Sequence, residues 1–536
     1  MTKNTKKFIA LGIAAVMALG TLAGCGGNKT SENATNVSNE QSSGGEKVLK
    51  FGCQMYSDGL IDPAAQINCA WNAMRYGITE SLFKFDDNMN VIPWLADSYE
   101  VSDDHKTWTI KLKEGVKFSD GCEMTATKVK ESLDRVRAEG PNGSSTPEKF
   151  LEYEAEVTAD DEANTITIQT KTAYIDLTGN LAHPVMAITD VADTTDWDNG
   201  TIGTGPYAAE KFTDQVGYDL VKNTYYYEEV PYDRVELLYM GDASAKAMAL
   251  QNGQVDLVEN ITNVSDIQKL QEDENYTVDI AAGVRTGFAW MNHSGVLGND
   301  TLRKAILMSI DYKTICESNT IGGLYTPGFS VLPSSLDYGY DSLNNPYEYD
   351  PEGAMKLMDD AGIVDNDGDG IRELDGKNIN LTVVSYENRL LNDFADAQSQ
   401  YLAKVGIGTT AKYGSSDDQW SSLVAGEYDF NQNNWTTVAT GDPIDYMANW
   451  YSKCDSDYCG YENAEYDKLY EQLLVEMDKE KRVELITQMQ QILVNDAAVL
   501  VDGYYNSSMI YSKNIASAHI HTADYYWITT EIIPAN

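Results

Sequence analysis

The side chains that most often carry catalysis are scarce or poorly spaced in this chain. Only five histidines occur among 536 residues. No HExxH pair, GxSxG turn or correctly spaced phosphate-binding loop is present in the sequence. Carboxylates are so numerous that a pair of the glycosidase type could be drawn almost anywhere. We therefore expect a protein that is not an enzyme and that needs no cofactor.

Two short patterns contain residue types that bind metals. His519 and His521 are two residues apart, so an extended segment would place both imidazoles on one face. Residues 365–370 read Asp-Asn-Asp-Gly-Asp-Gly, like the first half of a calcium loop, but Gly376 stands where a bidentate glutamate is required. We expect a tight turn before a strand at 380–385 and no resident metal, with calcium as the alternative for the loop.

The first 47 residues predict export. Three lysines among the first seven residues precede an apolar run at 8–19, which is the layout of a signal peptide at 1–24. The run is shorter than the ~20 residues that a transmembrane helix needs. Cys25 ends a Leu-Ala-Gly-Cys sequence that resembles the bacterial lipobox, whose cysteine is lipidated and anchors the mature chain. Residues 25–47 would then form a lipidated, flexible tether; in the alternative, the signal is cleaved and Cys25 has no role.

Size and charge limit the remaining possibilities. The ~490 residues after the tether exceed one hydrophobic core and suggest two or three domains. A net charge of −44 makes nucleic acid an unfavourable partner, because such a surface repels phosphates. Export would permit a disulfide between Cys454 and Cys459, and we expect the other cysteines after Cys25 to be small buried side chains.

Hydrophobic periodicity predicts alternating strands and helices, which favours α/β domains with mixed sheets. Strands are expected at residues 47–52, 107–112, 165–169, 235–239 and 381–385. Helices are expected at residues 123–137, 244–252, 300–310, 351–361, 392–405 and 466–494.

Several short sequence blocks follow one another along the chain. They are PWLADSY (93–99), KTWTIKL (106–112), GVKFSDG (115–121), GTGPY (203–207), ALQNGQVD (249–256), LRKAI (302–306) with ID (310–311), YDP (349–351), AG (361–362) and GI (406–407). Their order resembles the extracytoplasmic solute-binding proteins of ABC importers, in the peptide and nickel class called family 5, and the resemblance covers nearly the whole mature chain. Most of the blocks identify the fold and not the site: we expect Trp108 and Phe118 in the core and Gly121 in a turn.

The resemblance implies the type II periplasmic-binding fold, in the large cluster with an extra subdomain. This is an α/β fold with mixed sheets and two lobes joined by a hinge. The expected division is lobe I at 48–80, 200–288 and 500–536, the extra subdomain at 81–199, and lobe II at 289–499.

The same resemblance implies a monomeric receptor on the outer face of the bacterial cytoplasmic membrane, in the periplasm or at the cell surface, anchored by a lipidated Cys25. It would capture oligopeptides or dipeptides in an interlobe cleft and deliver them to the permease subunits. Nickel or a metal chelate and oligosaccharides are alternative ligands. A secreted hydrolase is the alternative from a different class.

In the peptide-binding relatives, an aspartate shortly after a tryptophan pairs with the ligand's α-ammonium group. Here Trp435 and Asp442 match the landmarks, but residues 436–440 contain no acidic residue. Either Asp442 or Asp58 replaces the missing carboxylate, or the ligand is not a free-amine peptide. We expect Trp435 to form one wall of the pocket. The remaining ligand-binding candidates are Tyr56, Ser57, Thr436, Thr437, Tyr504 and Tyr505.

Overall fold

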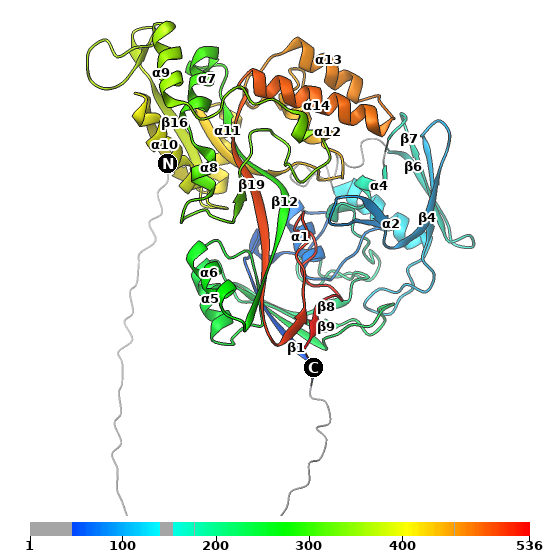
Figure 1. The fold of residues 1–536 in the computed structure, drawn as a ribbon. Coiled ribbons are helices and arrows are strands. Elements are labelled where there is room, and N and C mark those ends of the chain that lie inside the picture. The colour runs from blue at the N-terminus through cyan, green and yellow to red at the C-terminus, as the bar shows by residue number, and fades with distance from the viewer. Residues whose placement is uncertain (1–45, 140–153, 176, 455, 536) are drawn as a thin grey trace, which may run out of the picture. The chain divides into compact units, whose positions relative to one another are not determined.

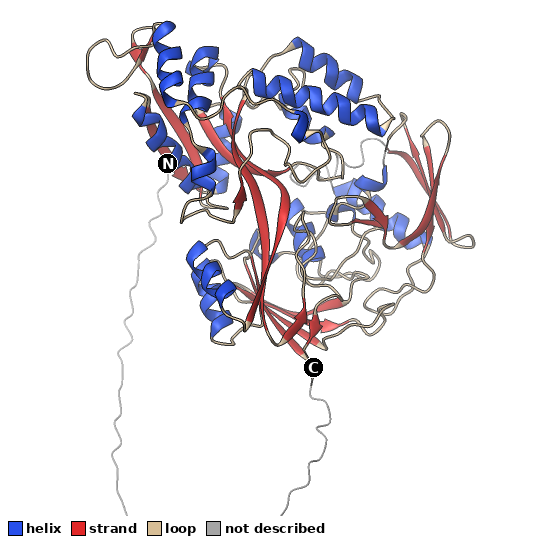
Figure 2. Cartoon of the chain, in the orientation of Figure 1, coloured by secondary structure: helices blue, strands red, loops and turns tan. Residues whose placement is uncertain are grey.

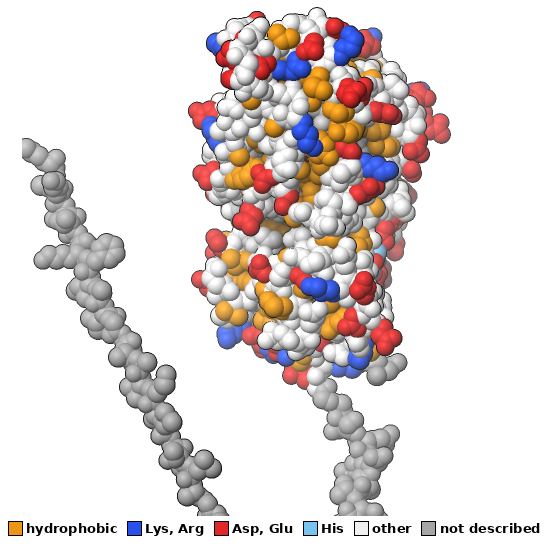
Figure 3. Space-filling model, turned by 60° about the vertical axis from the view of Figure 1, so that its left-hand side comes forward, with side chains coloured by type: hydrophobic (Ala, Val, Ile, Leu, Met, Phe, Trp, Pro, Cys, Tyr) orange, Lys and Arg blue, Asp and Glu red, His pale blue; other side chains and the backbone are white. Residues whose placement is uncertain are grey.

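The computed structural model describes residues 46–139, 154–175, 177–454 and 456–535. Residues 46–536 form one compact unit. The expected signal peptide, Cys25 and nearly all of the tether lie outside the described residues, so their predictions are not tested. Within the described ranges, no helix has both the length and the apolar character needed to cross a bilayer. Acidic side chains are spread over the face shown in Figure 3 and do not gather in one patch.

An eleven-stranded mixed sheet runs through this unit and connects its parts (Figures 1 and 2). Its strands, in order across the sheet, are β17 (Gly408–Gly414), β16 (Asn380–Tyr386), β18 (Phe430–Thr436), β12 (Tyr276–Met291), β19 (Val499–Ser512), β11 (Leu257–Glu259), β1 (Val48–Cys53), β10 (Arg234–Tyr239), β9 (Gly217–Lys222) and β8 (Tyr207–Thr213), with β13 (Tyr325–Thr326) paired to β19.

The long strands β12 and β19 belong to both halves of the sheet. One end of β12 pairs with β18 over residues 285–291, whereas the far end of β19 pairs with β11. The two strands pair antiparallel with each other, with a register shift between Ala281 and Arg285. In Figure 1 they run through the centre, between the group that includes α7 and α14 and the group that includes α5, α6 and β1. We call the part built on β16–β18 the β16 half, and the part built on β1 and β8–β11 the β1 half.

A separate antiparallel sheet lies within the expected extra subdomain. Its strand order is β4 (Ala96–Val101), β5 (Thr107–Leu112), β7 (Thr165–Thr170) and β6 (Glu154–Asp160). Burial alternates along β5, where Trp108, Ile110 and Leu112 are buried against helix α2 (Ala126–Glu139). This alternation is the reason that the sequence pattern predicted the strand.

Helices cover both halves of the large sheet. Their bounds are α1 (Ile67–Arg75), α4 (Leu177–Asn180), α5 (Ala243–Gln251), α6 (Val264–Glu272), α7 (Asp300–Ser309), α8 (Tyr312–Cys316), α9 (Pro351–Asp360), α10 (Leu391–Lys404), α11 (Ser416–Ala425), α12 (Ile444–Met447), α13 (Ala464–Leu473) and α14 (Lys479–Asn495). The remaining strands of the described residues are short: β2 (Phe83–Phe85), β3 (Val91–Pro93), β14 (Glu373–Leu374), β15 (Lys377–Asn378), β20 (Ile515–Ser517) and β21 (Ile533–Pro534).

The sequence pattern was wrong about one helix. Residues 466–494 were expected to form a single helix, but the structure has α13 and α14 with a break between them. Asp478 causes the break, because its side chain accepts hydrogen bonds from the backbone N–H groups of Glu480 and Lys481 and so starts a new helix. The expected lobe boundaries at 288/289 and 499/500 fall inside β12 and at the start of β19.

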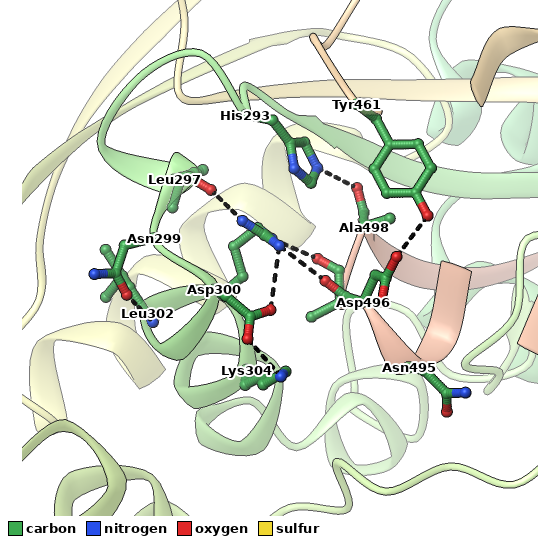
Figure 4. Close-up of polar contacts among 12 residues, drawn as sticks. His293, Leu297, Asn299, Asp300, Leu302, Lys304, Tyr461, Asn495, Asp496 and Ala498 are labelled. Carbon is green, nitrogen blue, oxygen red and sulfur yellow. Dashed lines mark hydrogen bonds and ion pairs between the residues drawn. The ribbon is translucent and has the colours of Figure 1, made fainter. Parts of the chain in front are cut away.

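A buried arginine, Arg303, ties α7 to the junction between α14 and β19. Figure 4 labels three of the residues that it contacts, Leu297, Asp300 and Asp496. The Arg303 guanidinium donates to the backbone carbonyls of Leu297 at 2.7 Å, Asp496 at 3.1 Å and Ala497 at 3.2 Å. It also lies 3.3 Å from the carboxylate of Asp300. This explains Arg303 within the LRKAI block as a structural residue, because three carbonyls at a chain reversal would otherwise lack donors.

We predict that Arg303→Met lowers the free energy of unfolding by about 2–4 kcal/mol, because it leaves buried carbonyls without donors. Urea denaturation followed by circular dichroism measures this change. Lys304→Met on the same helix is the control, since its exposed ion pair with Asp300 should contribute less than about 1 kcal/mol. Equal losses in the two variants would contradict the structural role of Arg303.

Candidate ligand-binding cleft

A cavity of about 700 Å³ opens where the carboxyl ends of four strands meet. The segments that follow β1, β16 and β17 line it, together with the last residues of β18. Ligands of open α/β sheets bind at the carboxyl ends of the strands, because the loops that leave the sheet there form a crevice. We call this cavity the cleft. It continues into a side cavity of about 410 Å³ that shares Gln54 and residues 387–389 with it.

Both halves of the sheet contribute residues to the cleft. From the β1 half come Gln54, Met55, Tyr56, Ser57, Ile67, Asn68 and Trp71. From the β16 half come Tyr386, Glu387, Asn388, Arg389, Gly414, Ser415, Ser416, Asn434, Trp435, Thr436 and Ala439. Arg285 on β12 is also among the lining residues.

Trp435 forms an aromatic wall on the β16 side. Its ring makes edge-to-face contacts with Phe288 at 5.8 Å and with Trp290 at 5.6 Å, both on the neighbouring strand β12. Such contacts fix the orientation of an aromatic ring beyond what simple burial does. Trp435 therefore presents a rigid apolar surface to whatever occupies the cleft.

On the β1 side of the cleft, a buried ion pair supports the aromatic residues Tyr56 and Trp71. Arg75 donates to the carboxylate of Asp524 at 2.9 Å, and both side chains are 1% exposed. The Arg75 guanidinium lies 5.3 Å from the ring of Tyr56 and 5.2 Å from the ring of Trp71. These cation–π contacts position two aromatic residues of the cleft, so Arg75 supports the wall without lining it.

Two arginines place positive charge in the cleft, and neither was anticipated from the sequence. Arg285 is 4% exposed, and burial lowers its pKa to about 10, with a contribution in the same direction from Arg389. Arg389 lies over the ring of Tyr505 at 5.5 Å. The signal that could have identified Arg285 is a charged residue inside an otherwise apolar stretch, because such residues are seldom buried without a functional reason.

The structure brings four of the predicted site residues together in the lining of the cleft: Tyr56, Ser57, Trp435 and Thr436. Asp442 is not among the lining residues. Its carboxylate pairs with Arg482 at 2.8 Å and accepts from the Ile444 N–H at the start of α12. The Asp442 carboxylate is therefore already bound to structural partners within the protein.

The other four candidates also lie outside the lining. Asp58 is exposed. Thr437 is buried and donates to the carbonyl of Val284, and Tyr504 donates to the carbonyl of Ser330. Tyr505 is buried, and the Arg389 guanidinium, which does line the cleft, lies 5.5 Å from its ring.

The residues of the two metal-like patterns are not among those that line the cleft. His519 lies between the carboxylates of Asp87 and Asp279, and His521 bonds to the carbonyl of Asp86; both histidines line a different cavity, of about 480 Å³. In the 365–370 loop, Asp365 accepts from two backbone N–H groups, as a tight turn requires. Asp365, Asp367 and Glu373 have ligand atoms within 4.8 Å of one another, which is the calcium-like feature of this loop.

The described cysteines are all free thiols, so the possible bond between Cys454 and Cys459 is not formed. Four of the six are buried, as expected for small apolar side chains: Cys53, Cys69, Cys316 and Cys459. Cys122 and Cys454 are half-buried.

A buried carboxyl group lies on β19. Burial raises the pKa of Asp502 to about 8, against the opposing effect of the Gln398 amide, which donates to Oδ1 at 2.5 Å. Gln398 in turn accepts from Gln432 on β18 at 2.6 Å. These three side chains form a buried polar chain that links α10 to two strands of the sheet.

A sheet whose halves share two continuous strands and enclose a cavity lined from both halves defines a bilobal binding fold. The chain belongs to the Bacterial extracellular solute-binding proteins, family 5 Middle, whose family model matches residues 90–458. The protein is thus an extracytoplasmic solute-binding receptor of an ABC importer and not an enzyme.

Three comparisons illustrate the range of this family. The oligopeptide-binding protein AppA of Bacillus subtilis is 24% identical over 546 residues, which cover 97% of each chain. A structure of AppA from Bacillus subtilis in complex with a nonapeptide has a TM-score of 0.75 at 21% identity and covers 92% of this chain and 100% of that chain. NikA from Staphylococcus aureus in complex with Ni(L-His)₂ has a TM-score of 0.76 at 22% identity, with coverage of 91% and 100%. These structures share the fold, but they do not identify the ligand of this chain.

We predict that Asp502→Asn makes stability less dependent on pH. The raised pKa means that the folded state holds a proton between about pH 4 and pH 8 that the unfolded chain releases, so this group's stabilising contribution falls as pH rises through that window. The melting temperature of the variant relative to wild type should therefore be higher at pH 8.5 than at pH 5. The exposed Asp341→Asn is the control, and a pH-independent difference for Asp502→Asn would contradict the prediction.

Proposed function

We propose that this receptor captures short peptides in the cleft and presents them to the permease of its importer. The observation that carries this proposal is the composition of the lining. Eight of the lining side chains are amides or aliphatic hydroxyls: Gln54, Ser57, Asn68, Asn388, Ser415, Ser416, Asn434 and Thr436. Such groups match the alternating donors and acceptors of a peptide main chain.

Two of these polar side chains have free hydrogen-bonding capacity beside Trp435. Within the described part of the chain, the Thr436 hydroxyl and the Asn434 side-chain oxygen are buried and have no hydrogen-bond partner. Buried polar atoms without partners are unfavourable unless a ligand or water satisfies them. A ligand amide packed against the Trp435 ring could bond to both.

Capture would couple to movement of the two halves. A ligand that touches residues of both halves stabilises the closed arrangement by its differential affinity, which is a population shift and needs no catalytic group. The strands β12 and β19 are the connections through which such a closure must act, because both pass from one half into the other.

We predict that Trp435→Ala weakens the best-binding dipeptide or tripeptide at least tenfold, or by about 1.4 kcal/mol, through loss of the aromatic wall. Thermal shift would select the peptide, and isothermal titration would measure the dissociation constant. A saturating peptide at a hundredfold excess over Kd should raise the stability of wild type by about 2.7 kcal/mol.

Trp420→Ala is the matched control, because Trp420 is 46% exposed on α11 and outside the cleft lining. Peptide affinity unchanged by Trp435→Ala would exclude this wall from the site. Binding of Ni(II)–histidine or of oligosaccharides, with no response to peptides, would keep the receptor role and overturn the peptide assignment.

We also propose that Cys25 carries the lipid that holds the receptor at the outer face of the membrane. The support is the position of Cys25 in a lipobox-like sequence between an apolar run and a polar tether. Two acyl chains give stable anchoring, whereas one is marginal.

We predict that cells expressing wild type incorporate labelled palmitate into the receptor and that Cys25→Ala abolishes the label. The variant should also appear in the soluble or secreted fraction, where wild type stays with the membrane. Equal labelling of the two proteins would refute the lipid anchor.

A further inference from the structure

Arg285 occupies an unusual place at the centre of the molecule. It lies on β12, directly after the register shift in the pairing with β19, and opposite Thr436 on β18. Its side chain is 4% exposed, yet it lines the cleft. The guanidinium is therefore removed from bulk water while it remains accessible to a bound ligand.

The hydrogen-bonding capacity of Arg285 is largely unused. Its Nη1 atom makes a long contact of 3.4 Å with the Asn434 carbonyl, whereas Nε and Nη2 have no partner among the described residues. No described carboxylate forms an ion pair with it, and Glu387, the one acidic residue of the cleft lining, is exposed. A buried, unpaired guanidinium is costly, so a partner from outside the chain is expected.

Other buried arginines of this chain do have partners. Arg75 pairs with Asp524 at 2.9 Å, and Arg482 pairs with Asp442 at 2.8 Å. Buried arginines elsewhere in this fold thus have carboxylate partners, whereas Arg285 in the cleft has none among the described residues. Arg389, which also lines the cleft, has an unpartnered Nε atom as well.

The sign of the charge at this wall is the opposite of the one expected for a free-amine peptide. The segment after Trp435 lacks an acidic residue, and the strand register places Arg285 beside it, opposite Thr436. An α-ammonium group at this position would be repelled by a guanidinium in a low-dielectric site. A carboxylate would instead accept the two free donors in a bidentate, charge-assisted pair.

We propose that Arg285 binds an acidic group of the ligand, so that the cleft selects solutes with a carboxylate, and without a free amine, at the end next to Trp435. This inference rests on the proposed capture of a small solute in the cleft and specifies its chemistry. N-blocked or acidic peptide-like compounds fit this description, and so do free polycarboxylates.

The test uses three series of the same dipeptides, with a free amine, an N-acetyl group or an N-succinyl group at the amino end, and citrate as a probe that is not a peptide. Isothermal titration with the mature receptor should show binding at least tenfold tighter for the succinyl series than for the free-amine series. Arg285→Met should abolish this preference and the thermal shift caused by citrate. Arg285→Lys, which keeps the charge, should retain part of both.

Stability of the ligand-free protein separates a ligand-binding arginine from a structural one. Arg285→Met should leave the melting temperature unchanged or raise it, because it removes an unpaired buried charge. Arg75→Met should lower it, because it leaves Asp524 unpaired. A fall in melting temperature for Arg285→Met as large as that for Arg75→Met would mean that Arg285 is structural, and would overturn the inference.

Each binding outcome decides one of the two proposals. Free-amine dipeptides that bind as tightly as succinylated ones, or a succinyl preference that survives Arg285→Met, would overturn the role of Arg285 and leave peptide capture intact. Loss of free-amine binding in Glu387→Gln would identify that carboxylate as the ammonium site instead. A citrate shift that depends on Arg285, without binding of any dipeptide, would support the anion site and remove peptides as ligands. No shift with citrate and no binding of the succinyl series would overturn the inference.

Discussion

The antiparallel pairing of β12 with β19 is the contact on which the arrangement of the cleft depends. Both strands continue from the β1 half into the β16 half, so each half holds the other in register through backbone hydrogen bonds. The pairing is interrupted between Ala281 and Arg285, and a Cβ atom on Gly283 would lie 2.1 Å from the Tyr505 carbonyl oxygen. Glycine is required there because the two backbones approach so closely. Arg285 follows directly after this irregularity, at the wall of the cleft.

The buried arginines divide into two groups with different physical roles. Arg303 donates to protein oxygens from all three guanidinium nitrogens and Arg75 from Nε and Nη2, and each ties together segments that are distant in sequence. Arg285 makes one long hydrogen bond to the Asn434 carbonyl, lies 5.3 Å from the Trp71 ring and has no carboxylate partner among the described residues. In the proposed role, the cost of burying its charge is offset when a ligand binds. Binding proteins tolerate such a cost where the missing partner arrives with the ligand, because the same cost then becomes affinity and selectivity.

Local patterns predicted the parts of the fold that are set by local physics. The alternation at 107–112 and the helix at 300–310 were found because each has its own periodicity and, for α7, an N-cap at Asn299. The strands β12 and β19 were not predicted. Their residues 283–291 and 499–505 are buried on both faces, so they do not alternate, and their partners are far away in the sequence.

The site was predictable only where the family resemblance supplied a landmark. Trp435, Thr436, Tyr56 and Ser57 line the cleft, and each lies near the carboxyl end of a strand. Arg285 and Arg389 could not be paired from sequence, since 104 positions separate them and only the sheet topology brings both to one cavity.

The distribution of thiols gives this receptor a built-in pair of labelling positions. Burial raises the pKa of Cys69 to about 11 and those of Cys316 and Cys459 to about 12, so their thiolates are scarce at neutral pH. Cys122 and Cys454 are the half-buried thiols, the first in the segment that carries the small antiparallel sheet and the second after α12 on the β16 side. The pKa of Cys122 is raised too, by a hydrogen bond to Asp120, so a maleimide spin label or fluorophore would select Cys122 and Cys454 by their partial exposure and not by thiolate character. Under the proposed closure, the distance between the two labels would follow the movement without any engineered cysteine.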